Sequence, residues 1–360
     1  MLQLRGTLCA KSFIVALAAL AATASFAQSS VTLYGVFDTG FQSNKLTVGS
    51  DSYKQTAAVQ GGMSGNRIGF KGEEDLGGGM KANFTVELGL DPTEANSAFG
   101  DNNRQSFVGV SGGFGAVTIG RQYTVHHSNQ GAGDMLGNLN GQTGYLGSMD
   151  SLVRASNAFV YTSPSFNGVT VSVEKALGET VTNADLAVGA NSAAASSEKK
   201  NEAQGIRVSY VGGPLSVGYA YEELKNGSFA AVKLLGNTIA DTVVGGLNFD
   251  KRKANSLAVA YDFGVAKVGL VSNSTKYDTV KWTNNSLSAA VPMGAATLFA
   301  STSAGKIAED GESLKLSAYQ LGASYALSKR TNVYAFTGQQ KWKDIDVKYT
   351  QTTVGVRHTF

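Results

Sequence analysis

Apolar and polar residues alternate strictly in many short segments, and the pattern recurs up to the last residue of this chain of 360 residues. In residues 81–90, Ala, Phe, Val, Leu and Leu occupy the even positions, while Lys, Asn, Thr, Glu and Gly occupy the odd ones. Such a period of two places successive side chains on opposite faces of a β-strand. Comparable segments begin at residues 31, 169, 215, 257 and 321. The chain is therefore predicted to be all-β, with one apolar face on most strands.

Two kinds of connection separate these strands. Seven are short and rich in turn-forming residues, which predicts hairpins: 77–79, 112–115, 164–168, 212–214, the turn around Gly264, 292–294 and 328–329. Longer polar stretches cover 44–64, 91–103, 122–155, 178–202, 224–253, 305–315 and 340–349, with a short one near 277–280. This pattern predicts about 16 strands, with both chain ends on the side of the short turns. Residues 230–249 contain two further β-like runs, so 18 strands are the alternative.

Strands with one apolar face fit two architectures. A secreted sandwich or propeller would bury that face in a core, whereas a membrane barrel turns it to lipid and lines its interior with the polar face. The predicted strands are similar in length, short connections alternate with long ones, and no domain boundary is apparent. These features favour a single closed barrel over residues 28–360. Closure also leaves no strand edge unpaired in lipid. We expect a 16-stranded antiparallel transmembrane barrel with short periplasmic turns and long outer loops.

Residues 1–27 are predicted to be a cleaved signal peptide. Arg5 and Lys11 form a positive region, residues 12–24 are apolar but too few to span a bilayer, and 25–27 fit a small-x-small cleavage site. A single N-terminal anchor is the alternative. Removing the two cations lowers the formal net charge from +3 to +1, which gives no support for a nucleic-acid partner.

Four segments carry a resemblance to a known family. They are SVTLYGVFD at 30–38, NRIGFKGEEDLG at 66–77, RQSFVGVSGGFG at 104–115 continuing to Arg121, and VGVRHTF at 354–360. In their order and spacing they resemble the general trimeric porins of Gram-negative outer membranes, especially the betaproteobacterial type. The resemblance implies a homotrimer, a third outer loop folded into the lumen, and passive diffusion of small hydrophilic solutes and ions through a water-filled channel. It implies neither enzymatic activity nor a cofactor.

Alternation also predicts which side chains face the lumen. With Ile68 and Phe70 turned to lipid, Arg67 and Lys71 point inward, since a charge facing lipid at mid-bilayer costs about 2–4 kcal/mol. Arg104 is ambiguous, because its neighbours Phe107 and Val108 compete for the outward side. The other predicted lumen-facing residues are Tyr34, Asp38, Lys81, Glu87, Arg207 and Arg357.

The resemblance also implies a constriction in which arginines on the wall face acids on the third loop. Arg67 and Arg104 match the first two wall positions, and Arg154 resembles the third. The loop is expected over 123–153, where the acids are Asp134 and Asp150, although the Pro-Glu-Phe-Gly stretch of enterobacterial members is absent. Three arginines opposite few acids predict a weak preference for anions.

Phe360 ends the predicted last strand, on one face with Val354, Val356 and His358. This strand is expected to pair with residues 31–41 and close the barrel. The resemblance implies that the barrel assembly machinery of the outer membrane also recognises this C-terminal aromatic residue. Phe360 could at the same time belong to a girdle of aromatic residues in contact with membrane lipid.

Other functions have weaker support in the sequence. Gly109–Gly113 match G-x-S-x-G, but they enter a predicted hairpin rather than the strand-to-helix elbow that a nucleophile needs. His126 and His127 have no third metal ligand at suitable spacing. A substrate-selective channel, a barrel enzyme and an adhesin remain alternatives; for the first, Tyr34 is a single inward aromatic and forms no aromatic slide.

Overall fold

The computed structural model describes residues 30–93, 103–136, 152–182, 197–200, 202–229 and 247–360. Its strands are β1 (Ser30–Val48), β2 (Asp51–Gln60), β3 (Arg67–Gly77), β4 (Met80–Gly89), β5 (Asn103–Gly112), β6 (Gly115–Tyr123), β7 (Arg154–Thr162), β8 (Val169–Ala176), β9 (Glu179–Thr182), β10 (Ser197–Lys200), β11 (Glu202–Gly212), β12 (Leu215–Phe229), β13 (Leu247–Asp262), β14 (Lys267–Tyr277), β15 (Val280–Met293), β16 (Ala296–Glu309), β17 (Glu312–Ala326), β18 (Thr331–Trp342) and β19 (Val347–Thr359). One helix, α2 (Val125–Gly133), follows β6. Within these residues, no helix has the length and apolar character needed to cross a membrane.

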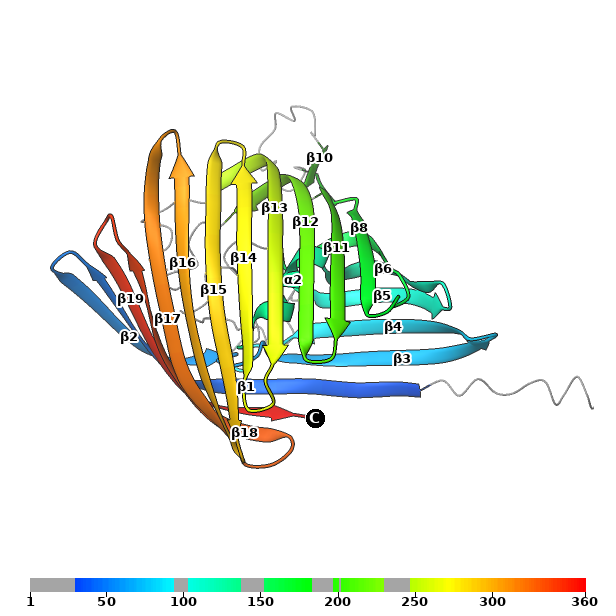
Figure 1. Cartoon of the computed structure of the whole chain (residues 1–360), viewed down its shortest axis with the longest axis horizontal. Helices are drawn as coiled ribbons and strands as arrows, with labels where there is room; N and C mark the ends of the chain where they lie inside the picture. The colour runs from blue at the N-terminus through cyan, green and yellow to red at the C-terminus, as the bar shows by residue number, and fades with distance from the viewer. Residues whose placement is uncertain (1–29, 94–102, 137–151, 183–196, 201, 230–246) are drawn as a thin grey trace, which may run out of the picture.

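Seventeen strands form one antiparallel sheet that closes on itself (Figure 1). β9 and β10 form a separate two-stranded sheet, and β8 pairs with β11. Apart from β2 and β3, which do not pair with each other, each remaining strand pairs with the next along the chain, and β19 pairs with β1. Because β2 and β3 pair with consecutive parts of β1, they share one position in the wall, and the ring has 16 members. The prediction of a closed 16-stranded barrel is confirmed. β12 and β13 pair directly with each other as far as Phe229 and Leu247, so no further strand pair lies between them in the wall. Residues 230–246, for which the sequence left two more strands open, lie outside the described residues.

All seven predicted short turns join consecutive strands of the ring. The longer connections were predicted less well, because 44–64 is mostly strand: β1 and β2 continue to a tight turn at Gly49 and Ser50. Likewise β16 and β17 meet across Asp310 and Gly311, inside the expected connection 305–315. At the outer ends of these strands the outward face is polar, and the apolar residues, such as Leu46, Leu314 and Leu316, lie on the inner face. The outward apolar stripe that marks a strand is therefore lost although the backbone pairing continues.

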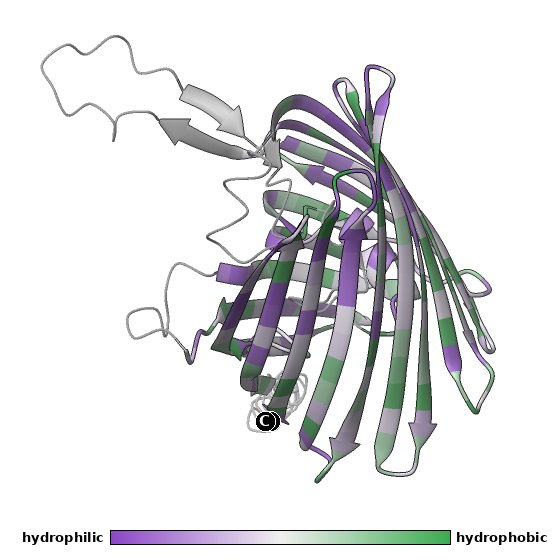
Figure 2. Ribbon diagram, turned by 90° about the vertical axis from the view of Figure 1, so that its left-hand side faces the viewer, coloured by the Kyte–Doolittle hydropathy of each residue, from purple (hydrophilic) through white to green (hydrophobic). Residues whose placement is uncertain are grey.

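The apolar face points outward, as the alternation predicts. Val31, Leu33 and Phe37 are exposed, whereas Val36 and Asp38 on the opposite face of β1 are buried. Figure 2 shows the resulting alternation of hydrophilic and hydrophobic residues along the strands. An exposed apolar stripe on each strand of a closed ring is the arrangement of a barrel that contacts lipid.

Phe360 extends the closure between β1 and β19. Its backbone exchanges two hydrogen bonds with Gly35, with N···O distances of 3.1 and 3.2 Å, and its ring stacks on Phe37 at 6.1 Å. The predicted partner segment 31–41 is only partly right, because β19 pairs with Val36–Val48 while Ser30–Val36 pair with β3.

The outward face of β15 provides a test of depth in the membrane. Leu287 is 48% exposed on this face, and Thr283 lies on the same face closer to the outer turn. We expect Leu287→Arg to lower the free energy of unfolding by about 2–4 kcal/mol and Thr283→Arg by about 0–1 kcal/mol, because the cost of a charge facing lipid falls towards the interface. Urea unfolding in phospholipid vesicles measures both. Equal losses would contradict the placement of Leu287 in the hydrocarbon layer.

Candidate functional site

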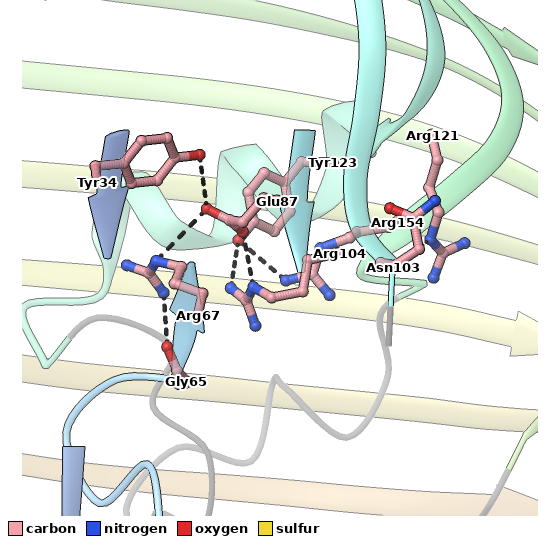
Figure 3. A network of polar contacts seen from close by, with 9 residues as sticks. All are labelled: Tyr34, Gly65, Arg67, Glu87, Asn103, Arg104, Arg121, Tyr123 and Arg154. Carbon is pink, nitrogen blue, oxygen red and sulfur yellow. Dashed lines mark hydrogen bonds and ion pairs between the residues drawn. The ribbon is translucent and has the colours of Figure 1, made fainter. Parts of the chain in front are cut away.

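Neighbouring strands bring one acid and two arginines together on the inner wall (Figure 3). Glu87 of β4 bonds to Arg104 Nε of β5 at 2.7 Å and lies 3.5 Å from Arg67 Nε of β3. Tyr34 of β1 donates its hydroxyl to the same carboxylate at 3.1 Å. The Glu87 side chain is only 5% exposed, so its charge is compensated by groups that share its face of the sheet.

A β-bulge turns Arg104 inward. Glu87 pairs with Gln105 but Leu88 pairs with Asn103, so Arg104 is the extra residue of β5. A bulge of this kind places two consecutive side chains on one face of a sheet. Strict alternation from the exposed Val108 would point Arg104 to lipid, and the bulge resolves that ambiguity in favour of the lumen.

Tyr123, at the end of β6, connects two of the arginines. Its hydroxyl accepts hydrogen bonds from Arg104 at 3.2 Å and from Arg154 of β7 at 3.1 Å. The Arg154 guanidinium lies 4.6 Å from the centre of the Tyr123 ring, within the range of a cation–π contact. Arg67, Arg104 and Arg154, together with Tyr34, Glu87 and Tyr123, are called the arginine cluster below.

An inserted segment between β2 and β3 leads into Arg67. Residues 61–66 interrupt the pairing with β1, and Asp38 of β1 accepts hydrogen bonds from the backbone N–H groups of Met63 and Ser64 at 2.8 and 2.6 Å. The buried Asp38 also accepts a bond from Tyr334 of β18 at 2.5 Å. Arg67 in turn donates to the Gly65 carbonyl at 3.0 Å. Asp38 therefore fixes the segment against which Arg67 is oriented.

Helix α2 belongs to the third outer connection and lies against the inner faces of β11–β14 (Figure 1). Thr124 caps it by accepting a hydrogen bond from His127 N at 3.1 Å. The Val125 N–H donates to a Glu174 carboxyl oxygen of β8 at 2.8 Å, which places a hydrogen-bond acceptor at the positive end of the helix. Asn129 donates to Ser256 Oγ at 2.9 Å. The inward fold of the third loop is thus built from side-chain bonds to the wall.

Glycines make room for this helix. A side chain at Gly218 of β12 would overlap the Asn129 carboxamide, and one at Gly269 of β14 would overlap the Gly133 carbonyl. A Cβ at Gly205 of β11 would lie 2.7 Å from Val125. Inward glycines in a strand commonly mark the close approach of another backbone.

A buried ion pair lies beneath α2. Arg252 of β13 and Glu222 of β12 are 2.6 Å apart, with side chains 2% and 0% exposed. Removing one partner of such a pair leaves an uncompensated buried charge and commonly costs about 3–5 kcal/mol. This pair therefore fixes the wall on which the helix rests.

A closed 16-membered barrel with a loop helix on its inner wall is characteristic of one group of membrane channels. A family model described as Gram-negative porin matches residues 15–344. The chain belongs to the Gram-negative porin family. It is accordingly an outer-membrane protein of a Gram-negative bacterium.

Relatives of this porin cover nearly its whole length. Outer membrane porin protein 32 of Delftia acidovorans and an outer membrane porin protein of Bordetella pertussis are each 30% identical to it, over 97% of this chain and 100% of the relative. The anion-selective porin from Comamonas acidovorans is similar in structure, with a TM-score of 0.70 and 27% identity over 92% of this chain and 100% of that one. OmpF of Salmonella typhi, at 19% identity and a TM-score of 0.62, shares the fold.

The remaining basic residues that were predicted to face the lumen lie at several sites on the barrel wall. Lys71 Nζ lies 5.6 Å from the centre of the Tyr34 ring, beside the arginine cluster. Lys81 pairs with Glu73 at 2.6 Å, and Arg207 bonds to Asn129 of α2 at 3.3 Å. Arg357 stands opposite Asp38 in the register of β1 and β19.

Of the two predicted loop acids, Asp134 lies away from the arginine cluster. Asp134 follows α2 beside β14, is 7% exposed, and accepts a hydrogen bond from Leu136 N at 3.0 Å. Asp150 and residues 1–29 lie outside the described residues, so Asp150 and the signal peptide stay predictions. The acid in contact with the arginines is Glu87.

Sequence reasoning did not single out Tyr123 or Glu174. Tyr123 lies where the strand gives way to the loop, so alternation does not predict the direction of its side chain. The hydrogen bond from Val125 N–H to Glu174 depends on a helix whose sequence shows no clear helical periodicity. His126 and His127 lie in that helix. His126 is buried against the wall, while His127 stacks on Tyr123 at 5.2 Å.

Gly218 tests the seating of α2. We expect Gly218→Val to push the helix towards the lumen, lower single-channel conductance, and cost about 1–3 kcal/mol of stability by overpacking. Gly113→Val is the matched control, because Gly113 lies in a turn with open space around its Cβ position. Planar-bilayer recording of both variants checks the result. Unchanged conductance of Gly218→Val would contradict the close packing.

His127 tests the charge of the site against pH. Burial, then Arg154 and Arg104, lowers the pKa of His127 to about 4. A lowered pKa keeps the imidazole neutral above that value, so we expect His127→Gln and the unaltered porin to show the same reversal potential from pH 5 to pH 8. A His127-dependent change with a midpoint near pH 6.5 would show that the imidazole is solvated instead.

Proposed function

We propose that this porin conducts small hydrophilic solutes and ions passively, with a weak preference for anions set by the arginine cluster. The supporting observation is the charge of that cluster. Three guanidinium groups and the single carboxylate of Glu87 leave a net charge of +2 on one part of the inner wall. Lys71, beside Tyr34, adds a further positive charge.

The positions of these charges favour selectivity over chemistry. Glu87 is shared by two arginines, while Arg154 bonds to a neutral phenol. Fixed positive groups on the wall of a water-filled pore raise the local concentration of anions and orient dipolar solutes. Nothing in this role requires a bond in the solute to change, so we propose that the porin is not an enzyme and uses no cofactor.

Similar proteins support the anion preference. The Comamonas acidovorans porin, at 27% identity, is described as anion-selective. Asp134 and Asp150 are proposed as acids of the third loop that moderate the positive field, and Arg207 and Arg357 as further lumen-facing cations. Asp134 lies near β14, distant along the wall from β3, β5 and β7.

Assembly is also a proposal. We propose a homotrimer, supported by a neighbour of the same fold, OmpT of Vibrio cholerae, whose structure is described as a trimer form. Phe360 is proposed as the signal read by the barrel assembly machinery, supported by its place at the closure of the ring. Outer-membrane lipid is the partner of the exposed apolar stripe.

Reversal potentials in a KCl gradient test the role of the cluster. We expect a weak chloride preference, which Arg104→Gln lowers by reducing the net charge from +2 to +1 and Glu87→Gln increases by raising it to +3. Arg330→Gln, in the turn between β17 and β18, is the control and should leave the potential unchanged.

The same recordings test the wider proposal. Current steps that appear in groups of three support an open trimer, and silent insertion would exclude a channel. A clear cation preference of the unaltered protein would overturn the assignment of the arginine cluster as the selectivity site.

A further inference from the structure

Two buried carboxyl groups meet under the N-terminus of α2. Glu174 of β8 and Glu222 of β12 are both in register with Gly205 of β11, the strand that lies between them. Gly205 has no side chain to separate the two groups, which interact electrostatically. Val125 of α2 covers this glycine so closely that a Cβ there would lie 2.7 Å from its methyl group. The wall and the helix therefore enclose both carboxyl groups in one place.

Each of these carboxyl groups has one oxygen with a partner and one without. Glu174 accepts a hydrogen bond from the Val125 N–H, and Glu222 accepts one from Arg252. In the described part of the chain, Glu174 Oε1 and Glu222 Oε2 are buried and have no hydrogen-bond partner, whereas buried polar atoms nearly always have one. A carboxylate only accepts hydrogen bonds, but a protonated carboxyl group also donates one. A single proton between the two free oxygens would therefore give both a partner.

The positive groups nearby balance only one of the two possible negative charges. Arg252 of β13 forms its ion pair with Glu222. Arg207, which points inward from β11, bonds instead to Asn129 of α2. Among the residues that the structure describes, no ion pair includes Glu174, and the end of a helix supplies only a partial charge. A negative charge on Glu174 would thus face that of Glu222 without a cation of its own.

Other titratable groups around the pair do not supply the missing positive charge. Burial lowers the pKa of His126 well below its usual range and that of His127 to about 4, so both imidazoles of α2 are neutral at pH 7. On β7, Val160 stands opposite Glu174 and carries no charge. Arg154 of the same strand bonds to a tyrosine of the arginine cluster. A proton is therefore the remaining means of neutralising the second carboxyl group.

We propose that Glu174 and Glu222 share one proton and that this proton keeps the N-terminus of α2 against the wall. Two carboxylates at close range in a buried site do not both ionise readily, because each raises the free energy of the other's charged form. While the proton is present, Glu174 donates to Glu222 and still accepts from the Val125 N–H. Once it is lost, two like charges lie under the helix, and water must enter to solvate them. Because there is no spare room between Gly205 and Val125, this water displaces the helix towards the lumen.

The direction of the pH effect follows from this geometry. At neutral and lower pH the pair holds its proton, α2 rests on the wall and the lumen is wide. As the pH rises and the proton leaves, the helix moves inward and the conductance falls. The step belongs to the pair rather than to either residue, because the two groups titrate together. This effect on conductance rests on the proposed function, whereas the shared proton itself does not.

Single-channel conductance in KCl from pH 6 to pH 9 tests the proposal. The unaltered porin should conduct less as the pH rises, along a curve for the loss of one proton. Glu174→Gln should show no such fall, because its amide accepts from Val125 and donates to Glu222 without titrating. Glu312→Gln, which changes an exposed acid at the outer turn between β16 and β17, is the control and should keep the pH dependence of the unaltered porin.

Infrared spectroscopy detects the proton without any conduction. The C=O band of a protonated carboxyl group is separate from the bands of a carboxylate. The difference between the spectra of the unaltered porin and Glu174→Gln should contain one such band at pH 6 and lose it by pH 9.

The two measurements separate failure of this inference from failure of the proposed function. The same conductance curve for the unaltered porin and Glu174→Gln, or a difference spectrum at pH 6 without the protonated band, would overturn the inference. If no current were found at any pH, the proposed function would fail, and the infrared band alone would support or overturn the shared proton.

Discussion

The requirement that no backbone N–H or C=O remains unpaired in lipid determines this structure. A sheet can meet it only by closing, and here the last strand returns to the first through a register that runs from Val36 and Thr359 to Val48 and Val347. Gly35 and Phe360 continue the ladder beyond β19. Closure fixes the direction of every side chain, because alternate residues must face either lipid or the lumen.

Departures from that regular ladder build the interior. The bulge at Arg104 adds a second inward side chain beside Glu87, and the insertion at 61–66 orients Arg67. Tyr123 stands where β6 gives way to the loop, within reach of both Arg104 and Arg154. Irregular backbone at these positions is tolerated because it lines a cavity rather than lipid.

The sequence predicts the features that follow from the residue pattern of a single strand or turn. Alternation places Glu87 on the inner face of β4, and Gly78 and Gly79 indicate a turn. Alternation within one strand does not predict features that depend on how several strands lie against one another. The inward direction of Arg104 depends on a register shift with β4, and the helix α2 depends on Gly205, Gly218 and Gly269, which lie on three separate strands. The tight turn at Gly49 is missed because the outward residues of the adjacent strands are polar near the turn, so no outward apolar stripe marks these strand ends.

The cations that line the lumen and the lysines on the outside of the barrel, such as Lys276 and Lys281, differ for physical reasons. Inside the barrel, Arg104 divides its planar guanidinium between Glu87 and Tyr123, and Arg154 lies over an aromatic face. A guanidinium can make these directed contacts while remaining charged with few waters around it. On the outside, lysines keep a compact ammonium on a flexible stem. The stem can cover apolar surface while the charge extends to the headgroups, so a lysine tolerates variation in depth along the membrane boundary. A planar guanidinium therefore suits a fixed carboxylate in the lumen, whereas a flexible ammonium suits the boundary between lipid and water.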